Sequence, residues 1–272
     1  MRIYVPQKRY GKSIIIRNVD IQLNRGMSTL IIGTSGAGKS TLIGCIIREG
    51  FRYVTFEDDE FHGRMPKIAY IQQHPALNKD LTVRETIYYA RRFEYLFEPK
   101  DQVNRKVDKY IDMLGLRARQ DNKVRKLSGG QQQRVAIAKE LIRDCEILIA
   151  DEIDTGLDCG VARSLAETLA DITREQKIIT LVISHNVINI PLYDKIVVLA
   201  KDKDNIGGVA YDCPPDRILN FFNVRDYFSI LTQVNLKEEG GNGLGDYFIN
   251  LTRNDPHQDQ AFRGNTERGR KL

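Results

Sequence analysis

Apolar positions along the chain predict a β-rich start followed by an α/β core. Residues 2–5 and 13–23 carry β-branched side chains in partial alternation, which predicts a small antiparallel sheet. Later apolar runs are continuous, as in strands buried on both faces of a parallel sheet that is covered by helices. These runs lie at residues 29–32, 146–151, 177–184 and 195–200.

Helical periodicity separates these runs. Between Ala90 and Leu116 apolar residues recur at intervals of three and four, which predicts an amphipathic helix that Gly115 ends. A second stripe predicts the crossover helix between two core strands. The first face carries Val103, Val107, Tyr110, Ile111 and Leu114, and the second carries Val161, Leu165, Leu169 and Ile172.

Beyond Phe222 the pattern weakens. The glycine-rich stretch 238–245 predicts a flexible link, and residues 255–272 are polar enough to predict a disordered tail. We therefore expect a main domain over residues 1–222, with a helical part at about 74–127. A C-terminal extension over 223–254 and the polar tail over 255–272 follow.

Composition limits the cellular context. The 272 residues contain no run of about 20 apolar residues and no secretory signal at the start, so we expect a cytoplasmic protein. The four cysteines form no CxxC pair, which argues against a zinc site or a disulfide framework. A net charge of +5, without a basic stripe interleaved with aromatics, argues against nucleic acid as a partner.

A glycine-rich loop carries the strongest chemical signal. Gly33-TSGA-Gly38-Lys39-Ser40 fits the phosphate-loop pattern and lies between a predicted strand and a predicted helix. Glycines let backbone N–H groups point at phosphate oxygens, Lys39 supplies a cation, and the Ser40 hydroxyl suits Mg²⁺. The expected ATP contacts of the loop are Gly33, Thr34, Ser35, Gly36, Ala37, Gly38, Lys39, Ser40 and Thr41.

Two adjacent acids end a predicted core strand. Asp151 and Glu152 point in opposite directions if the extended geometry persists, so they can take different roles. We expect Asp151 to hold the hydration shell of Mg²⁺ and Glu152 to orient the attacking water.

Leu127-Ser-Gly-Gly-Gln-Gln-Gln-Arg134, shortly before that strand, resembles the signature motif of ABC ATPases. The resemblance covers roughly residues 1–222. It implies an α/β P-loop NTPase with a mostly parallel core sheet, an N-terminal antiparallel β subdomain and a helical subdomain. ATP and Mg²⁺ are the implied cofactors, and ATP hydrolysis is the implied reaction.

The same resemblance implies a dimer that encloses ATP. Ser128, Gly129 and Gly130 are expected to begin a helix whose free N–H groups bind the γ-phosphate held by a partner subunit. That partner is either a second copy of this chain or another ABC ATPase subunit. The residues expected to contact the partner's ATP are Ser128, Gly129, Gly130, Gln131 and Asp158.

Smaller matches to the family complete the expected site. Tyr10 resembles the aromatic residue that stacks on adenine, Gln73 the magnesium-sensing glutamine, and His185 the switch histidine. The implied catalytic set is Glu152, His185, Gln73 and Lys39, and the implied Mg²⁺ set is Ser40, Gln73 and Asp151. The chain departs from many relatives at Ile153-Asp154, where extra negative charge is expected to slow turnover.

Most members of this family drive membrane transport. The insert between Gln73 and Ser128 resembles the part that grips a cytoplasmic helix of a permease. Two segments, 81–92 and 207–222, resemble White-type (G-subfamily) exporters, so we expect an exporter ATPase on the inner face of the membrane, bound to a separate permease. The alternative is a soluble ABC ATPase such as the iron–sulfur cluster assembly type.

Overall fold

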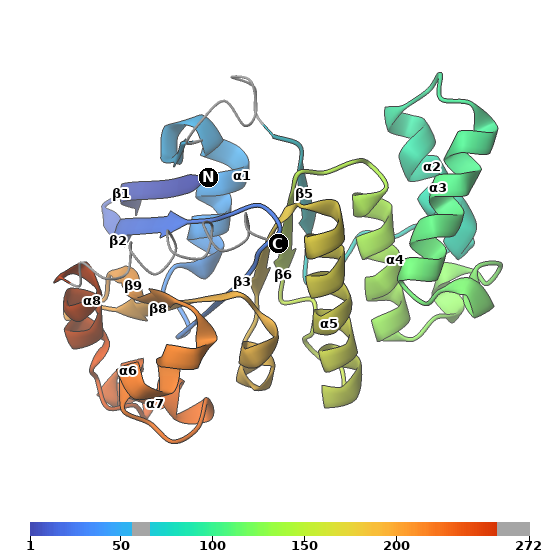
Figure 1. The fold of residues 1–272 in the computed structure, drawn as a ribbon. Helices are drawn as coiled ribbons and strands as arrows, with labels where there is room; N and C mark the ends of the chain where they lie inside the picture. Colours follow the sequence, from blue (N-terminus) through green and yellow to red (C-terminus); the bar gives the residue numbers. More distant parts are fainter. Residues whose placement is uncertain (56–65, 255–272) are drawn as a thin grey trace, which may run out of the picture. The chain divides into compact units, whose positions relative to one another are not determined.

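The computed structural model describes residues 1–55 and 66–254. These residues form two compact units, one comprising residues 1–24, 29–55 and 185–254, the other residues 25–28 and 66–184. The polar tail predicted at 255–272 lies outside the described residues. Figure 1 shows the elements of each unit.

An antiparallel sheet begins the first unit. β1 (Arg2–Tyr10) pairs with β2 (Ser13–Gln22) and with the short strand β4 (Val54–Thr55), both antiparallel. Ile3 and Val5 are buried while the residues between them are exposed, as the alternating pattern requires. The antiparallel sheet predicted at the start of the chain is therefore confirmed.

The rest of this unit carries the first core strands. β3 (Ser28–Gly33) runs parallel to β8 (Lys195–Lys201), which pairs antiparallel with β9 (Gly207–Cys213). Within this unit the strand order is β4-β1-β2-β9-β8-β3. All of β3 is buried, which confirms the continuous apolar run, and α1 (Lys39–Tyr53) follows it.

A parallel sheet forms the centre of the second unit. β5 (Ile68–Ile71), β6 (Ile147–Asp151) and β7 (Ile179–Ile183) are parallel, in the order β7-β6-β5. α5 (Cys159–Gln176) connects β6 to β7 as the predicted crossover helix. Its buried residues include Leu165, Leu169 and Ile172, whereas Val161 is only half-buried.

A helical insert follows β5 in the same unit. It contains α2 (Val83–Glu94), α3 (Lys100–Met113) and α4 (Gly129–Leu141), which lie side by side in Figure 1. Two short 3-10 turns, Arg117–Arg119 and Val124–Lys126, join α3 to α4.

The single helix predicted from Ala90 to Leu116 was wrong at its start. Ala90 lies inside α2, and α3 begins only after Pro99, its N-cap. Proline lacks an N–H group and is accommodated at a helix start but not in a helix interior, so the chain breaks there. Gly115, with φ of 65°, lies just beyond α3 as predicted.

The C-terminal extension is more ordered than its sequence suggests. After α6 (Ile218–Phe222), which ends the expected main domain, the extension forms α7 (Phe228–Val234) and α8 (Gly245–Asn254), and α8 packs on β9 (Figure 1). Gly240 and Gly243 have φ of 80° and 72°, so they form turns where a flexible link was expected. The remaining 3-10 turns are Val187–Leu192, Pro215–Arg217 and Lys237–Glu239.

Two expectations from composition are tested by the described residues. No helix among residues 1–55 and 66–254 is both long and apolar enough to cross a bilayer. Cys45, Cys145, Cys159 and Cys213 are free; Cys159 is exposed and the other three are buried.

Candidate functional site

The phosphate loop between β3 and α1 depends on its glycines. Gly36 and Gly38 have φ of 72° and 94°, which favours glycine. A Cβ at Gly33 would lie 2.4 Å from the carbonyl oxygen of Leu199, and one at Gly38 would lie 2.1 Å from Cγ2 of Ile16. Larger residues at these places would push the loop out of position.

Lys39 folds back over this loop. Its buried Nζ donates hydrogen bonds to the carbonyl oxygens of Gly33 at 2.9 Å and Thr34 at 3.1 Å. The buried Thr34 Oγ1 makes no hydrogen bond within the described part of the chain. A glycine-rich turn before a helix, with a cation and a spare hydroxyl, has the donors that phosphate oxygens need.

Tyr10 lies in the same unit, at the end of β1. Its side chain is exposed, and the ammonium of Lys8 lies 5.6 Å from the centre of its ring. An exposed aromatic face suits stacking on a base. His185 also belongs to this unit and is exposed just after β7.

The two acids at the end of β6 face different partners. Asp151 accepts a hydrogen bond from the Tyr70 hydroxyl at 2.9 Å, and Glu152 accepts one from Nε2 of Gln73 at 3.1 Å. Nε2 of Gln133 in turn donates to the backbone carbonyl of Gln73 at 3.0 Å. The structure therefore brings Gln73 and Glu152 together within the second unit, and it gives the two carboxylates different hydrogen-bond partners.

Glu152 has a strained backbone. Its φ of 50° lies in the left-handed region, which is uncommon for a residue other than glycine. Hydrogen bonds hold the turn: the Glu152 N–H donates to Ile183 O at 2.8 Å, and the Glu152 carbonyl accepts from the Thr155 N–H at 3.1 Å. Such strain persists where surrounding structure imposes it and is frequent at functional sites.

Asp154 does not stand alone in the turn after Glu152. Its Oδ2 accepts a hydrogen bond from Ser184 Oγ at 2.6 Å. Part of its charge is therefore used to tie the turn to the end of β7. The slower turnover expected from this acid stays a prediction.

The signature segment begins α4 with a capping box. Ser128 Oγ accepts from the Gln131 N–H at 3.4 Å, and Oε1 of Gln131 accepts from the Ser128 N–H at 3.1 Å. The N–H groups of Ser128 and Gln131 are thus used inside the helix start, so the contact of this segment with a partner's ATP stays a prediction. The exposed backbone at Gly129 remains the donor best placed for an external anion.

Neighbouring segments shape this helix start. A Cβ at Gly130 would come within 2.7 Å of Cγ1 of Val161, so close packing requires glycine there. Asp158 is exposed and caps α5 by accepting from the Val161 N–H at 2.9 Å. Gly156, with φ of 76°, turns the chain two residues before Asp158.

The donors expected for Mg²⁺ suit this ion chemically. A hydroxyl from Ser40, a carboxylate from Asp151 and an amide oxygen from Gln73 are hard oxygen ligands. In the part of the chain that the structure describes, no three His, Cys, Asp or Glu residues gather as a metal cage. Mg²⁺ typically binds through few protein ligands together with nucleotide phosphates and waters, which fits this donor set.

Sequence reasoning missed Tyr70 and Gln133. Tyr70 lies on β5 opposite Ile149 of β6, and only this register brings its hydroxyl to Asp151. Gln133 belongs to the run of glutamines in the signature segment, but the run does not show which of them faces Gln73. Neither contact has a signal in the sequence.

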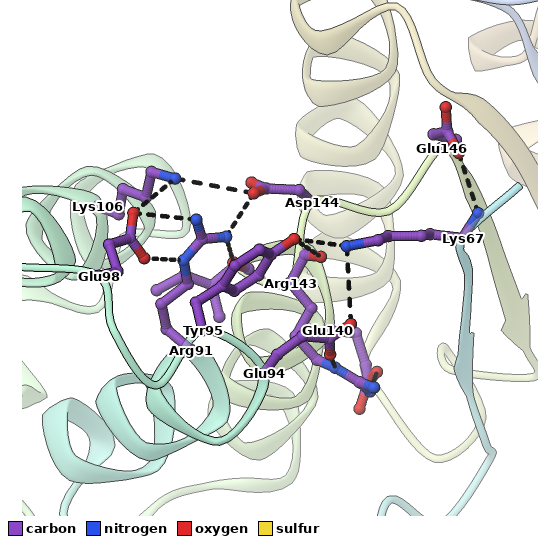
Figure 2. A network of polar contacts seen from close by, with 11 residues as sticks. Lys67, Arg91, Glu94, Tyr95, Glu98, Lys106, Glu140, Arg143, Asp144 and Glu146 are labelled. Carbon is purple, nitrogen blue, oxygen red and sulfur yellow. Dashed lines mark hydrogen bonds and ion pairs between the residues drawn. The ribbon is translucent and has the colours of Figure 1, made fainter.

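Arg91 organises a charged cluster in the helical insert, shown in Figure 2. Its guanidinium is 3% exposed and bonds Glu98 and Asp144, each at 2.5 Å, and the Ile142 carbonyl at 2.9 Å. The ring of Tyr95 lies 3.6 Å from the same guanidinium. Burial lowers the pKa of Arg91, but the bonds to Glu98 and Asp144 raise it above its ordinary value.

Beside this cluster the insert exposes apolar side chains that we call the aromatic ridge: Tyr89, Phe93, Leu96 and Phe97. Phe93 and Phe97 are 91% and 99% exposed. Side chains this large and this exposed, grouped within nine positions of the chain, are typical of a binding surface.

A pocket of about 200 Å³ lies elsewhere in the unit and is lined by Tyr70, Ile71, Gln72, Pro75, Ala76, Leu77, Ala136, Lys139 and Glu140.

Comparison with known proteins identifies the family. The sequence profile described as "ABC transporter" matches residues 16–155, more than half of the chain. The chain belongs to this family. Two solved structures share its fold: cbiO1 from Clostridium perfringens, part of the ABC transporter complex cbiONQ, and MJ1267, an ATP-binding cassette of an ABC transporter. The first has a TM-score of 0.68 at 22% identity, covering 80% of this chain and 90% of that one. The second has 0.64 at 24%, covering 81% and 95%.

Curated relatives are ATP-binding proteins of importers. Methionine import ATP-binding protein MetN 1 of Listeria monocytogenes serotype 4b is 34% identical over 187 residues, which is 64% of this chain and 55% of the relative. Sulfate/thiosulfate import ATP-binding protein CysA of Mycobacterium bovis is 32% identical over 230 residues, 79% of this chain and 64% of the relative. The chain thus spans less than two thirds of these relatives' length. They lend no support to the White-type exporter or to the iron–sulfur alternative.

Proposed function

We propose that this chain binds ATP with Mg²⁺, hydrolyses it, and thereby powers transport through a separate membrane permease. The observation that carries the proposal is the pairing of Glu152, strained and hydrogen-bonded to Gln73, in a chain that also builds a phosphate loop around Lys39. Family membership supports it.

The loop and its neighbours bind the nucleotide. Backbone N–H groups between Gly33 and Thr41 and the ammonium of Lys39 hold the phosphates. Tyr10 stacks on the adenine. Ser40, Asp151 and Gln73 would hold the magnesium ion, which neutralises charge on the phosphates when it is bound.

Hydrolysis relies on positioned oxygen and nitrogen atoms. Glu152 orients the attacking water and withdraws its proton in part, while Gln73 fixes the direction of the Glu152 carboxylate. Tyr70 does the same for Asp151. His185 contacts the γ-phosphate, as the family resemblance implies.

A dimer completes the reaction. Ser128, Gly129, Gly130, Gln131 and Asp158 contact the nucleotide held by the partner subunit. The partner is a second copy of this chain or a different ABC ATPase subunit. The exposure of Ser128, Gly129 and Asp158 supports this role.

The aromatic ridge docks the permease, which places the chain on the cytoplasmic face of the membrane. Large exposed aromatic residues on a rigid base bind apolar helices well, and the Arg91 cluster provides that base. We propose import as the direction of transport, because the import relatives match over 187 residues or more. The White-type resemblance rests on two short segments, 81–92 and 207–222.

Glu152→Gln tests the hydrolytic role. We expect the ATPase rate to fall by about 100-fold or more, while ATP still binds and holds a dimer on a sizing column. The matched control is Glu175→Gln, on the exposed face of α5, which should hydrolyse ATP normally. Normal turnover by Glu152→Gln would remove this residue from the mechanism.

A second experiment tests the transport role. The Glu152→Gln protein is isolated from its native cells with ATP and mild detergent, and the proteins bound to it are identified by mass spectrometry. We expect a polytopic membrane protein that is lost in Phe93→Ser/Phe97→Ser and retained in Phe228→Ser, whose aromatic residue is exposed in the C-terminal extension. Recovery of a soluble scaffold alone would support the cluster-assembly alternative.

A further inference from the structure

Lys201 lies against the phosphate loop from the end of β8. Its Cε and Nζ come within 3.2 and 3.3 Å of the place where a Cβ on Gly36 would be. Its side chain is only 14% exposed. A second ammonium group besides that of Lys39 is therefore packed on a backbone that is built to bind phosphate.

The partner of Lys201 comes from the C-terminal extension. Its Nζ bonds Oε1 of Glu239 at 2.9 Å, and Glu239 ends the 3-10 turn Lys237–Glu239. The extension also reaches the backbone here: a Cβ on Gly245, at the start of α8, would lie 2.4 Å from the Lys201 carbonyl oxygen. The C-terminal extension therefore contacts Lys201 twice, through the side chain of Glu239 and through the backbone at Gly245.

Lys195 on the same strand shows what a structural lysine looks like in this fold. It is 3% exposed, bonds Asp212 of the neighbouring strand β9 at 2.6 Å and donates to the carbonyl of Gln22, at the end of β2, at 2.7 Å. Lys201 differs because its partner is a half-exposed acid on a peripheral turn and its tip lies at the loop. Such a pair is weak and exchangeable, whereas a buried one is not.

We propose that Lys201 is a second cation of the nucleotide-phosphate site and that Glu239 of the C-terminal extension sets its strength. The inference rests on the phosphate loop proposed above. A positive charge at this distance attracts the phosphates through a partly dehydrated medium, and the nearby carboxylate of Glu239 cancels part of that attraction. Binding is reciprocal, so nucleotide phosphate draws Lys201 away from Glu239 and loosens the turn that carries it.

The test uses the full chain and calorimetric titration with MgATP and with adenosine. Lys201→Met should weaken MgATP binding about fivefold, whereas Glu239→Gln should strengthen it about threefold, the size expected of one partly exposed charge pair. Adenosine binding should not change, because adenosine has no phosphate. Lys201→Arg should bind MgATP normally, and Lys203→Met, at an exposed lysine in the connection between β8 and β9, is the matched control.

Turnover gives a second measurement. Lys201→Met should raise KM for MgATP and leave kcat nearly unchanged, because the charge acts on bound ground state and transition state alike. The double variant Lys201→Met/Glu239→Gln should match Lys201→Met alone, since Glu239 acts through Lys201.

Other outcomes would overturn the proposal. Unchanged MgATP affinity in both single variants would remove Lys201 from the site. Weaker binding in both, with a matching fall in melting temperature, would make the pair a structural tie only. Lys39→Ala distinguishes failure of the phosphate-loop assignment from failure of the proposal for Lys201. If Lys39→Ala bound MgATP normally, the phosphate-loop assignment itself would fail, independently of the results for Lys201.

Discussion

The phosphate loop and the Arg91 cluster differ in the groups that interact with charge, which are backbone groups in the loop and side chains in the cluster. The loop uses backbone: glycines with positive φ at positions 36 and 38 and close packing at Gly33 shape a turn that we expect to bind phosphate through its N–H groups. The Arg91 cluster uses side chains, with Glu98, Asp144 and the ring of Tyr95 around one buried guanidinium.

From this difference we propose that the loop serves ligand binding and that the Arg91 cluster serves rigidity. Backbone donors satisfied only in part leave room for a ligand, whereas a guanidinium with acceptors on several sides leaves none. We therefore expect loop variants to change ATP binding and cluster variants to change stability.

Arg91→Leu should have the largest effect on stability. Removing the buried guanidinium leaves the mostly buried Glu98 with Lys106 as its cation and costs about 3–5 kcal/mol of unfolding free energy. Urea denaturation measures the loss, and Arg119→Leu, at an exposed arginine of the same insert, is the control. ATP affinity of the folded variant should be unchanged; a large loss of affinity would break the proposed division of roles.

We expect a fall in pH to weaken the ion pairs of the Arg91 cluster before it affects the phosphate loop. The hydrogen bond from Arg91, with help from Lys106, lowers the pKa of Glu98 from 4.5 to about 2. Because the pKa of Glu98 is lower in the folded chain than in the unfolded chain, ionised Glu98 stabilises the fold at pH values above about 4.5. This stability is lost as the pH falls from about 4.5 towards 2. Glu98→Gln should remove up to about 2–3 kcal/mol at neutral pH and flatten that acid slope in urea titrations. An unchanged slope would contradict the assignment.

Unlike Arg91→Leu, Gly38→Ala should affect ATP binding more than stability. The new Cβ meets Ile16 in a left-handed conformation, so we expect a stability loss of about 1–3 kcal/mol together with a severe loss of ATP binding. Gly115→Ala has a similar φ but no neighbour within 4 Å, so it should cost about 1 kcal/mol and leave calorimetric ATP affinity unchanged. Equal ATP binding by the two variants would refute the role of the loop.

Ser128→Ala and Thr82→Ala give the smallest and sharpest comparison. Each removes the hydroxyl of a capping box, at α4 and at α2, and should cost about 1 kcal/mol in thermal unfolding. Only Ser128→Ala should also reduce the ATP-dependent dimer of the Glu152→Gln protein on a sizing column. Equal dimerisation in both would limit Ser128 to capping its helix.

Candidate site residues could be proposed from the sequence because their patterns are local. The glycine spacing before Lys39 and the acids after an apolar run each follow from backbone needs within a few residues. The same reasoning failed at α2 and α3, where a 3.6-residue pattern continues across Pro99 and hides the break. It also took Gly240 and Gly243 for a linker, although both sit in turns that lead to a packed helix.

By itself the sequence determined the α/β class and the family, and it predicted the phosphate loop and the acidic pair, since each depends on residues close together in the chain. The tertiary structure alone decided which side chains meet: Tyr70 with Asp151, Gln73 with Glu152, and Lys201 with Glu239. Those meetings depend on strand register and on the packing of segments separated by 38 to 81 residues, which local pattern does not encode.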